Sequence, residues 1–209
     1  AQFLNLEEKT NSNAIIDVAT YVGSEGKVLN FSRSYPPPKI DLSMRDYYQY
    51  LSTNTSTQTY FSNPVRNKGN GKWVFYLAKR ISNSKGEFLG IALIGVSAEV
   101  FSKFYEQIGS NLGEGSSLVL FKKDQTLLTR WPFVDERIGK VNNSENFTKF
   151  LENPKLQGEV ILTDAPTAIR NNERVQRMVA FRNVPGYPLV VGAVATEELY
   201  LTGWRQSLY

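Results

Sequence analysis

The fold is decided by the stretch GKWVFYLAKRISNSKGEFLGIALIGVSAEVF, residues 71–101. It begins with an apolar alternation, passes through the turn Asn83-Ser84-Lys85-Gly86, and continues as a second apolar run that ends at Ser97-Ala98-Glu99. Such alternation predicts strands, and Asn and Gly between two strands predict a tight turn. A serine followed by an acid predicts a helix start, because the hydroxyl caps free N–H groups. The expected order is therefore strand, turn, strand, helix.

The same order of elements returns in ERVQRMVAFRNVPGYPLVVGAVATEELY, residues 173–200. A shorter echo lies upstream of each stretch, in SEGKVLNFSRSYP at 24–36 and KKDQTLLTRWP at 122–132. Each echo reads as a tight turn, a short strand, an arginine and then a proline. The echoes are roughly 98 residues apart, which indicates two copies of one fold unit rather than a solenoid.

Antiparallel strands joined by short turns, with helices on one face, predict an α+β fold. We expect a long N-terminal helix and two sheet lobes in tandem. The predicted divisions are an N-terminal helix at 1–13, a first lobe at 14–109, a second lobe at 110–195 and a C-terminal helix at 196–209. Both end segments read as interrupted helices, so we expect the chain to be a piece of a longer protein.

The composition excludes much chemistry. The chain has 209 residues, 41% of them hydrophobic and 21% charged, with no Cys and no His. It therefore lacks a thiolate nucleophile, an imidazole base and the residues of a Cys or His metal site. The neighbouring acid pairs do not converge as a general acid and base must. We expect no catalytic residue, metal or cofactor.

The net charge of +4 is scattered along the chain. The densest basic clusters, AKR at 78–80 and RVQR at 174–177, each lie inside an apolar alternation. This favours the solvated faces of strands over a stripe that binds nucleic acid. No run of 18 apolar residues occurs, so no segment predicts a membrane span.

The segment SMRDYYQYL, residues 43–51, has two interpretations. As a helix that starts at Asp41 or Ser43, after three prolines, it carries one apolar stripe made of Met44, Tyr47, Tyr48 and Leu51. That helix packs on a sheet, and Arg45 faces the surface. Alternatively, the Arg45 guanidinium grips an anionic group, and the tyrosines supply ring faces and hydroxyls. The residues alone leave both interpretations open.

The order of elements, the twofold repeat and the motifs RDYY, YFSNPV, GKWVFYLAKRI, GEFLGIALIGVS and LLTRWP resemble the double Cache sensor domain. This is the tandem PAS-like extracytoplasmic module of bacterial receptors. The resemblance covers nearly the whole chain, and it is greatest to sensors of diguanylate cyclases and then of sensor histidine kinases. It implies a non-catalytic domain on the periplasmic side of the inner membrane, with flanking transmembrane helices and a homodimer contact through the N-terminal helix.

The resemblance also implies a ligand site in the first, membrane-distal lobe. Amino-acid-binding members carry an R-x-W-Y motif whose arginine holds the ligand carboxylate, and it maps to Arg45, Tyr47 and Tyr48. The aspartate that holds the ligand amine in those members corresponds to Gly95 here. We therefore expect a carboxylate-bearing or neutral ligand rather than an α-amino acid. The remaining pocket residues implied are Phe61, Asn63, Tyr76 and Ala78. A structural, dimerising or partner-binding module without a small ligand remains the alternative.

Overall fold

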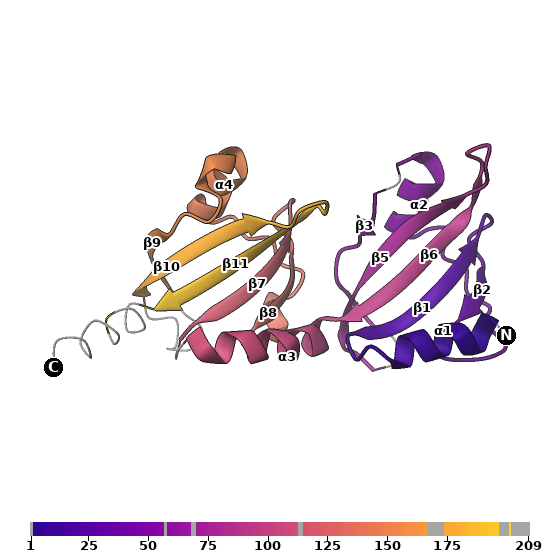
Figure 1. Ribbon diagram of the computed structural model, residues 1–209, viewed down its shortest axis with the longest axis horizontal. Coiled ribbons are helices and arrows are strands. Elements are labelled where there is room, and N and C mark those ends of the chain that lie inside the picture. The colour runs from indigo at the N-terminus through magenta and orange to yellow at the C-terminus, as the bar shows by residue number, and fades with distance from the viewer. Residues whose placement is uncertain are drawn as a thin grey trace. The chain divides into compact units, whose positions relative to one another are not determined.

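The computed structural model describes residues 2–56, 58–67, 70–112, 115–166, 174–196 and 201. The chain divides into two compact units, Ala1–Phe101 and Ser102–Tyr209, which we call the first lobe and the second lobe. Each lobe is built on one antiparallel sheet with helices beside it (Figure 1). The predicted α+β class with two antiparallel sheets is confirmed.

The first lobe has the sheet order β2-β1-β6-β5-β3, with β4 paired to β5. Helix α2 packs against β3, β5 and β6, whereas α1 packs against β1 and β2. The elements are α1 (Gln2–Asn11), β1 (Ile16–Gly23), β2 (Val28–Phe31), α2 (Asp46–Thr53), β3 (Tyr60–Phe61), β4 (Val65–Arg66), β5 (Trp73–Ser82) and β6 (Phe88–Ser97). Because α1 has only 10 residues, the long N-terminal helix expected from the sequence is not shown.

The second lobe has the sheet order β8-β7-β11-β10-β9. Helix α3 (Ala98–Gly109) begins in the first lobe and ends in the second. The other elements are η1 (Ser110–Leu112), β7 (Ser117–Lys122), β8 (Leu127–Trp131), η2 (Asp135–Arg137), α4 (Glu145–Glu152), η3 (Pro154–Leu156), β9 (Ile161–Pro166), β10 (Arg174–Asn183) and β11 (Leu189–Thr196). This strand order repeats that of the first lobe. The predicted C-terminal helix at 196–209 lies almost entirely outside the described residues.

The first hairpin of each lobe has the same construction. Gly23 N donates to Lys27 O at 2.9 Å in one turn, and Lys122 N donates to Thr126 O at 3.0 Å in the other. The turn residue with positive φ is Gly26 at +80° in the first lobe and Gln125 at +71° in the second. Cis peptide bonds precede Pro36 and Pro132, the prolines that end the two echoed segments.

Helix α2 begins later than the sequence predicted. It starts at Asp46, with Arg45 at the N-cap position, rather than at Asp41 or Ser43. The preceding segment is held in a turn, because Ser43 N donates to Asp41 Oδ1 at 2.8 Å. Leu42 N also donates to Gly26 O at 2.8 Å, which ties this segment to the first hairpin. Met44 is 82% exposed, so its predicted place in the apolar stripe is wrong.

The basic cluster at 78–80 is not a solvated face throughout. Ala78 is buried, and Arg80 Nη1 donates to Leu51 O at 2.6 Å and to Ser52 O at 3.0 Å. These carbonyls belong to the last turn of α2, where helical partners are lacking. Arg80 therefore supplies hydrogen bonds to carbonyl groups at the C-terminal end of α2.

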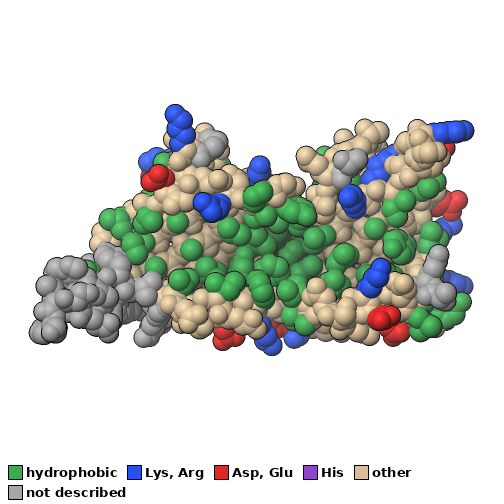
Figure 2. Space-filling view, in the orientation of Figure 1, with side chains coloured by type: hydrophobic (Ala, Val, Ile, Leu, Met, Phe, Trp, Pro, Cys, Tyr) green, Lys and Arg blue, Asp and Glu red, His purple; other side chains and the backbone are tan. Residues whose placement is uncertain are grey.

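On the face shown in Figure 2, the Lys and Arg side chains lie singly with acids among them, as the sequence indicated. None of the helices within the described part of the chain is long and apolar enough to cross a membrane.

Candidate functional site

The residues of the RDYY segment lie at the start of α2, which covers one face of the first sheet (Figure 1). Tyr47, Tyr48 and Leu51 are buried there. They form one cluster with residues of β1, β5 and β6, namely Val22, Ala78, Ile91 and Leu93. The amphipathic-helix interpretation is thus correct for these three residues. The packing also fixes Arg45 at the N-terminal end of α2.

Tyr48 is bonded into the lobe. Its hydroxyl donates to Ser24 O at 2.6 Å, and its ring meets the Phe88 ring edge-on with centroids 5.7 Å apart. Burial raises the pKa of Tyr48, which keeps the phenol protonated. The hydroxyl therefore connects α2 to the first hairpin.

Arg45, Tyr47 and Tyr76 form a group that we call the Arg45 cluster. The Tyr47 and Tyr76 rings lie 5.7 Å apart, and burial raises the pKa of both phenols while the charge of Arg45 acts in the opposite direction. Among the described residues, neither phenol oxygen nor the Arg45 guanidinium has a hydrogen-bond or ion-pair partner. Arg45 is exposed, whereas Tyr47 is only 3% exposed. One cation and two hydroxyls are therefore available to an acceptor from outside the chain.

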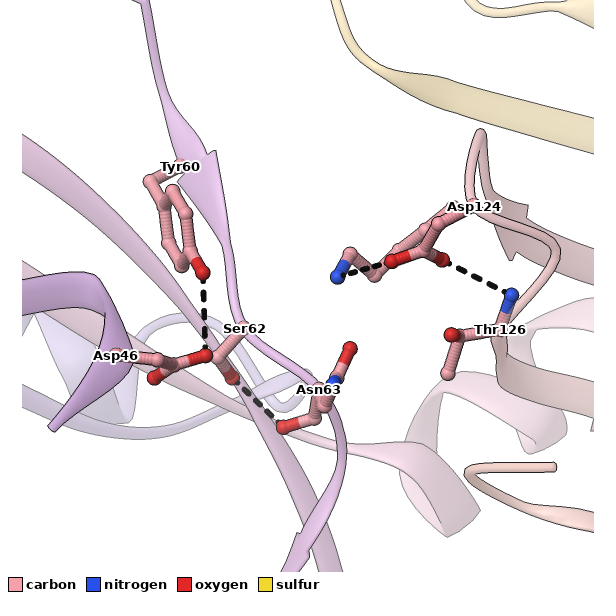
Figure 3. Close-up of polar contacts among 7 residues, drawn as sticks. Asp46, Tyr60, Ser62, Asn63, Asp124 and Thr126 are labelled. Carbon is pink, nitrogen blue, oxygen red and sulfur yellow. Dashed lines mark hydrogen bonds and ion pairs between the residues drawn. The ribbon is translucent and has the colours of Figure 1, made fainter. Parts of the chain in front are cut away.

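The other predicted pocket residues lie on neighbouring strands. Ser62 Oγ accepts a hydrogen bond from Tyr76 N at 2.8 Å. It donates to Asn63 O at 2.9 Å (Figure 3). The side chain of Asn63 is exposed. Phe61 and Ala78 are buried at 5% and 1% exposure, so they contribute apolar packing rather than polar contacts.

Gly95 lies at a crowded place in the middle of the first sheet. It pairs with Tyr76 on one side and Val18 on the other. A Cβ atom at residue 95 would lie 2.7 Å from Val18 Cγ1 and 3.1 Å from Tyr76 Cε1. An aspartate does not fit there unless its neighbours move. The structure thus agrees with the expectation that an amine-binding carboxylate is missing at this position.

Two acids near the Arg45 cluster were not recognised as site residues from the sequence. Asp46 accepts a hydrogen bond from the Tyr60 hydroxyl at 3.2 Å (Figure 3), and the charge of Asp17 contributes to the raised pKa of Tyr76. Asp46 belongs to the RDYY motif, but no role in the site was assigned to it. Asp17 comes from β1, so the sequence carried no signal for its proximity. Within the described part of the chain, no group of acids could hold a metal ion.

Comparison with known proteins agrees with this fold. Residues 98–194 match the family model dCache_1_like, described as a histidine kinase sensor domain. The extracellular domain of the putative histidine kinase rpHK1S-Z16 is 27% identical with a TM-score of 0.78, and the match covers 97% of this chain and 80% of that one. No curated protein matches the chain.

Two chemoreceptor structures share the fold at lower identity. The ligand-binding domain of the Pseudomonas aeruginosa PAO1 amino acid chemoreceptor PctB, in complex with L-Gln, is 14% identical with a TM-score of 0.62, covering 100% of this chain and 82% of that one. That of the Pseudomonas fluorescens chemoreceptor CtaA, in complex with L-serine, is 13% identical with a TM-score of 0.61, covering 94% of this chain and 79% of that one.

These findings confirm the predicted resemblance to double Cache sensor domains. Domains of this kind are ligand-binding modules of receptors and are not catalytic, which agrees with the non-enzymatic role expected from the sequence. The second half of the chain is therefore similar to histidine kinase sensor domains, and nearly the whole chain resembles the extracellular domain of one such kinase.

Proposed function

We propose that the first lobe binds a small, carboxylate-bearing molecule and that the Arg45 cluster holds its carboxylate. The observation that carries this proposal is the group of three donors that have no partner among the described residues, Arg45, Tyr47 and Tyr76. A guanidinium presents a planar fork that matches a carboxylate, and charge-assisted hydrogen bonds are stronger than neutral ones. The two phenols remain protonated because burial raises their pKa values, so both can donate.

The ligand differs from an α-amino acid in this proposal. The similar chemoreceptor domains of PctB and CtaA hold amino acids, which need a partner for the amine as well as for the carboxylate. Here Gly95 offers no carboxylate, and its neighbours leave no room for one. An organic acid without an amine satisfies the Arg45 cluster without leaving a buried ammonium unpaired.

The proposed receptor is an inner-membrane protein with this domain on its periplasmic side and a transmembrane helix at each end. Its output module is a histidine kinase, which the family model supports, or a diguanylate cyclase. A homodimer contact through α1 belongs to the same proposal. Ligand binding signals only if it favours one of two states, and typical coupling energies are about 1–3 kcal/mol.

Isothermal titration calorimetry tests the Arg45 assignment. The wild-type chain is titrated with acetate, propionate, succinate and glycine, and then compared with Arg45→Gln. We expect an organic acid to bind and glycine not to. Arg45→Gln should weaken the acid by more than tenfold, because a charge-assisted hydrogen bond contributes about 1.5–3 kcal/mol. Tyr47→Phe and Tyr76→Phe should each weaken it by less.

Lys79→Gln is the matched control, because Lys79 is also an exposed cation of the first lobe. It should leave the affinity unchanged. Equal affinities of the wild type and Arg45→Gln for every acid that binds would contradict the role of Arg45.

The burial of Tyr47 and Tyr48 favours a second candidate function, a structural, dimerising or partner-binding module in which these residues serve only the core. A thermal-shift screen with organic acids, amino acids and amines separates the two functions. A ligand present at about 100 times its Kd stabilises the folded state by about 2.7 kcal/mol. A flat response to all compounds would favour the second function.

A further inference from the structure

The second lobe contains a cavity of about 490 Å³ on one face of its sheet. Strand residues form one wall of this cavity, and residues between 137 and 144, together with Asn146 in the first turn of α4, form another. The wall on the sheet includes apolar side chains from three strands, namely Val119, Phe121, Val179, Phe181 and Val194. This volume falls in the range of small-molecule sites, about 300–1,000 Å³. None of these residues belongs to the Arg45 cluster.

Four basic residues from separate elements meet in this cavity. Arg130 comes from β8, Arg137 from η2, Lys140 from the segment after η2, and Arg177 from β10. The described residues that line the cavity include Asn and Ser side chains but no carboxylate. The described wall of the cavity is therefore rich in positive charge.

The strand pairing explains how the basic and apolar groups come to share one face. Arg130 pairs with Val119 across β8 and β7, and Val119 pairs with Gly192 across β7 and β11. A β-bulge at the Leu120/Phe121 step brings Leu127 and Arg130 onto the same face, although they are three positions apart in the chain. A regular strand would have turned one of these two side chains away from the cavity.

Arg130 is the most informative of these residues. It is only 8% exposed, and its Nε atom has no hydrogen-bond partner among the described residues. Burial, together with the charges of Arg137 and Arg177, lowers the pKa of Arg130 to about 10, so it remains a cation near neutral pH. A buried cation without an anionic partner is costly, and an anion in the cavity would remove that cost.

We propose that this cavity binds a small organic anion with at least two negative charges, carried by carboxylate or phosphate groups. A single negative charge would meet only one of Arg130, Arg137 and Lys140, whereas two or three negative charges match these three cations. Guanidinium forks bind both kinds of oxyanion bidentately. The apolar residues of the sheet wall favour a ligand with a carbon skeleton over an inorganic ion. The domain would then have two anion sites. The Arg45 cluster would hold one carboxylate, and the cavity of the second lobe would hold a ligand with at least two negative charges.

Binding is tested on the 209-residue chain by calorimetry with citrate, succinate and glycerol 3-phosphate. Acetate and inorganic phosphate serve as probes that lack the second charge or the carbon skeleton. We expect at least one of the three organic anions to bind, and Arg130→Met to weaken it by at least tenfold. Arg137→Gln changes an exposed residue and so gives a second variant that is expected to fold normally. It should weaken the same anion by a smaller factor.

Arg45→Gln is the control that separates this site from the one proposed in the first lobe. The Arg45→Gln variant should bind citrate or glycerol 3-phosphate with the same affinity as the wild type. The two proposals can therefore fail independently. If none of the three organic anions binds, or if Arg130→Met and Arg137→Gln both bind them as tightly as the wild type, the proposal is wrong. Binding of inorganic phosphate alone would also overturn it.

Discussion

Arg33 in the first lobe and Arg130 in the second lobe come from the two echoed segments but have opposite surroundings. Arg33 donates to Asp17 O at 2.5 Å and to Asn11 Oδ1 at 2.9 Å, so it fastens the end of α1 to β1. Arg130 lies in a cavity, and its Nε has no partner among the described residues. The fold is therefore repeated, but Arg33 and Arg130 have different roles in the two lobes. One arginine stabilises its lobe, whereas the other is available to a ligand.

Helices α2 and α4 also differ in the polarity of the aromatic side chains that they pack on their sheets. Helix α2 contributes Tyr47 and Tyr48, while α4 contributes Phe147 and Phe150, which are 0% and 1% exposed. The side chains of these phenylalanines carry no polar atom, so they pack on the sheet and cannot donate a hydrogen bond to an anion. In the second lobe the charged groups must come from strands and from the segment before α4. In the first lobe the cation is Arg45, at the N-cap of α2.

The largest expected effect concerns the aromatic core of the second lobe. The Phe147 ring lies 4.7 Å from both the Phe121 and the Phe181 rings, measured between centroids. Phe147→Ala should lower the free energy of unfolding by about 3–5 kcal/mol, because it leaves a cavity among packed rings. Urea denaturation followed by far-UV circular dichroism measures this loss.

Phe104→Ala is the control for that substitution, because Phe104 is 43% exposed. It should cost less than about 1 kcal/mol. Similar losses for the two variants would mean that α4 does not hold the second sheet through Phe147.

A smaller effect separates the two tyrosines of α2. Tyr48→Phe removes the hydrogen bond to Ser24 O and should cost about 1 kcal/mol of unfolding free energy, since the acceptor is left without its donor. Tyr47→Phe keeps the ring and removes a hydroxyl without a partner in the described part of the chain, so the unfolding free energy should hardly change. Urea denaturation of both variants without ligand makes the comparison. The opposite ranking would mean that the Tyr47 hydroxyl is the structural one.

The repeat of strands could be predicted because its signals are local. Alternation along residues 71–101 and 173–200, together with the turns inside them, identified β5, β6, β10 and β11. The start of α2 was placed too early, at Asp41 or Ser43, because these residues follow the three prolines closely. The sequence could not show that Leu42 and Ser43 are already held by the hairpin turn and by Asp41.

The charged groups were harder to predict because their surroundings depend on distant strands. Arg177 was read as part of a solvated face, but it lines the cavity with Arg130, which precedes it by more than 40 residues. Only the pairing of β8, β7, β11 and β10 brings them to one face. The Arg45 cluster was partly predictable, because Arg45 and Tyr47 are close in sequence. Tyr76 entered the prediction through the family resemblance rather than through any local pattern.

The smallest expected effect compares the acids of the two first hairpins. Asp124 accepts from Lys122 Nζ at 2.9 Å and from Thr126 N at 3.0 Å. Burial would raise the pKa of Asp124, but these hydrogen bonds outweigh it and hold the pKa below the ordinary 3.8. A depressed pKa means stability that is present above the ordinary value and is lost as the pH falls through the lower one.

Asp124→Asn should therefore cost a few tenths of a kcal/mol near neutral pH, because the carboxylate is 54% exposed and solvent screens the ion pair. The cost should shrink as the pH falls through the lowered pKa of Asp124, because the wild-type carboxyl then becomes protonated as well. Glu25→Gln is the matched control in the first hairpin, since Glu25 pairs with Lys27 at 3.1 Å and is 76% exposed. Its effect in urea denaturation should be smaller still, because the fully solvated pair contributes little. A larger loss of unfolding free energy for Glu25→Gln than for Asp124→Asn would contradict this ranking of the two acids.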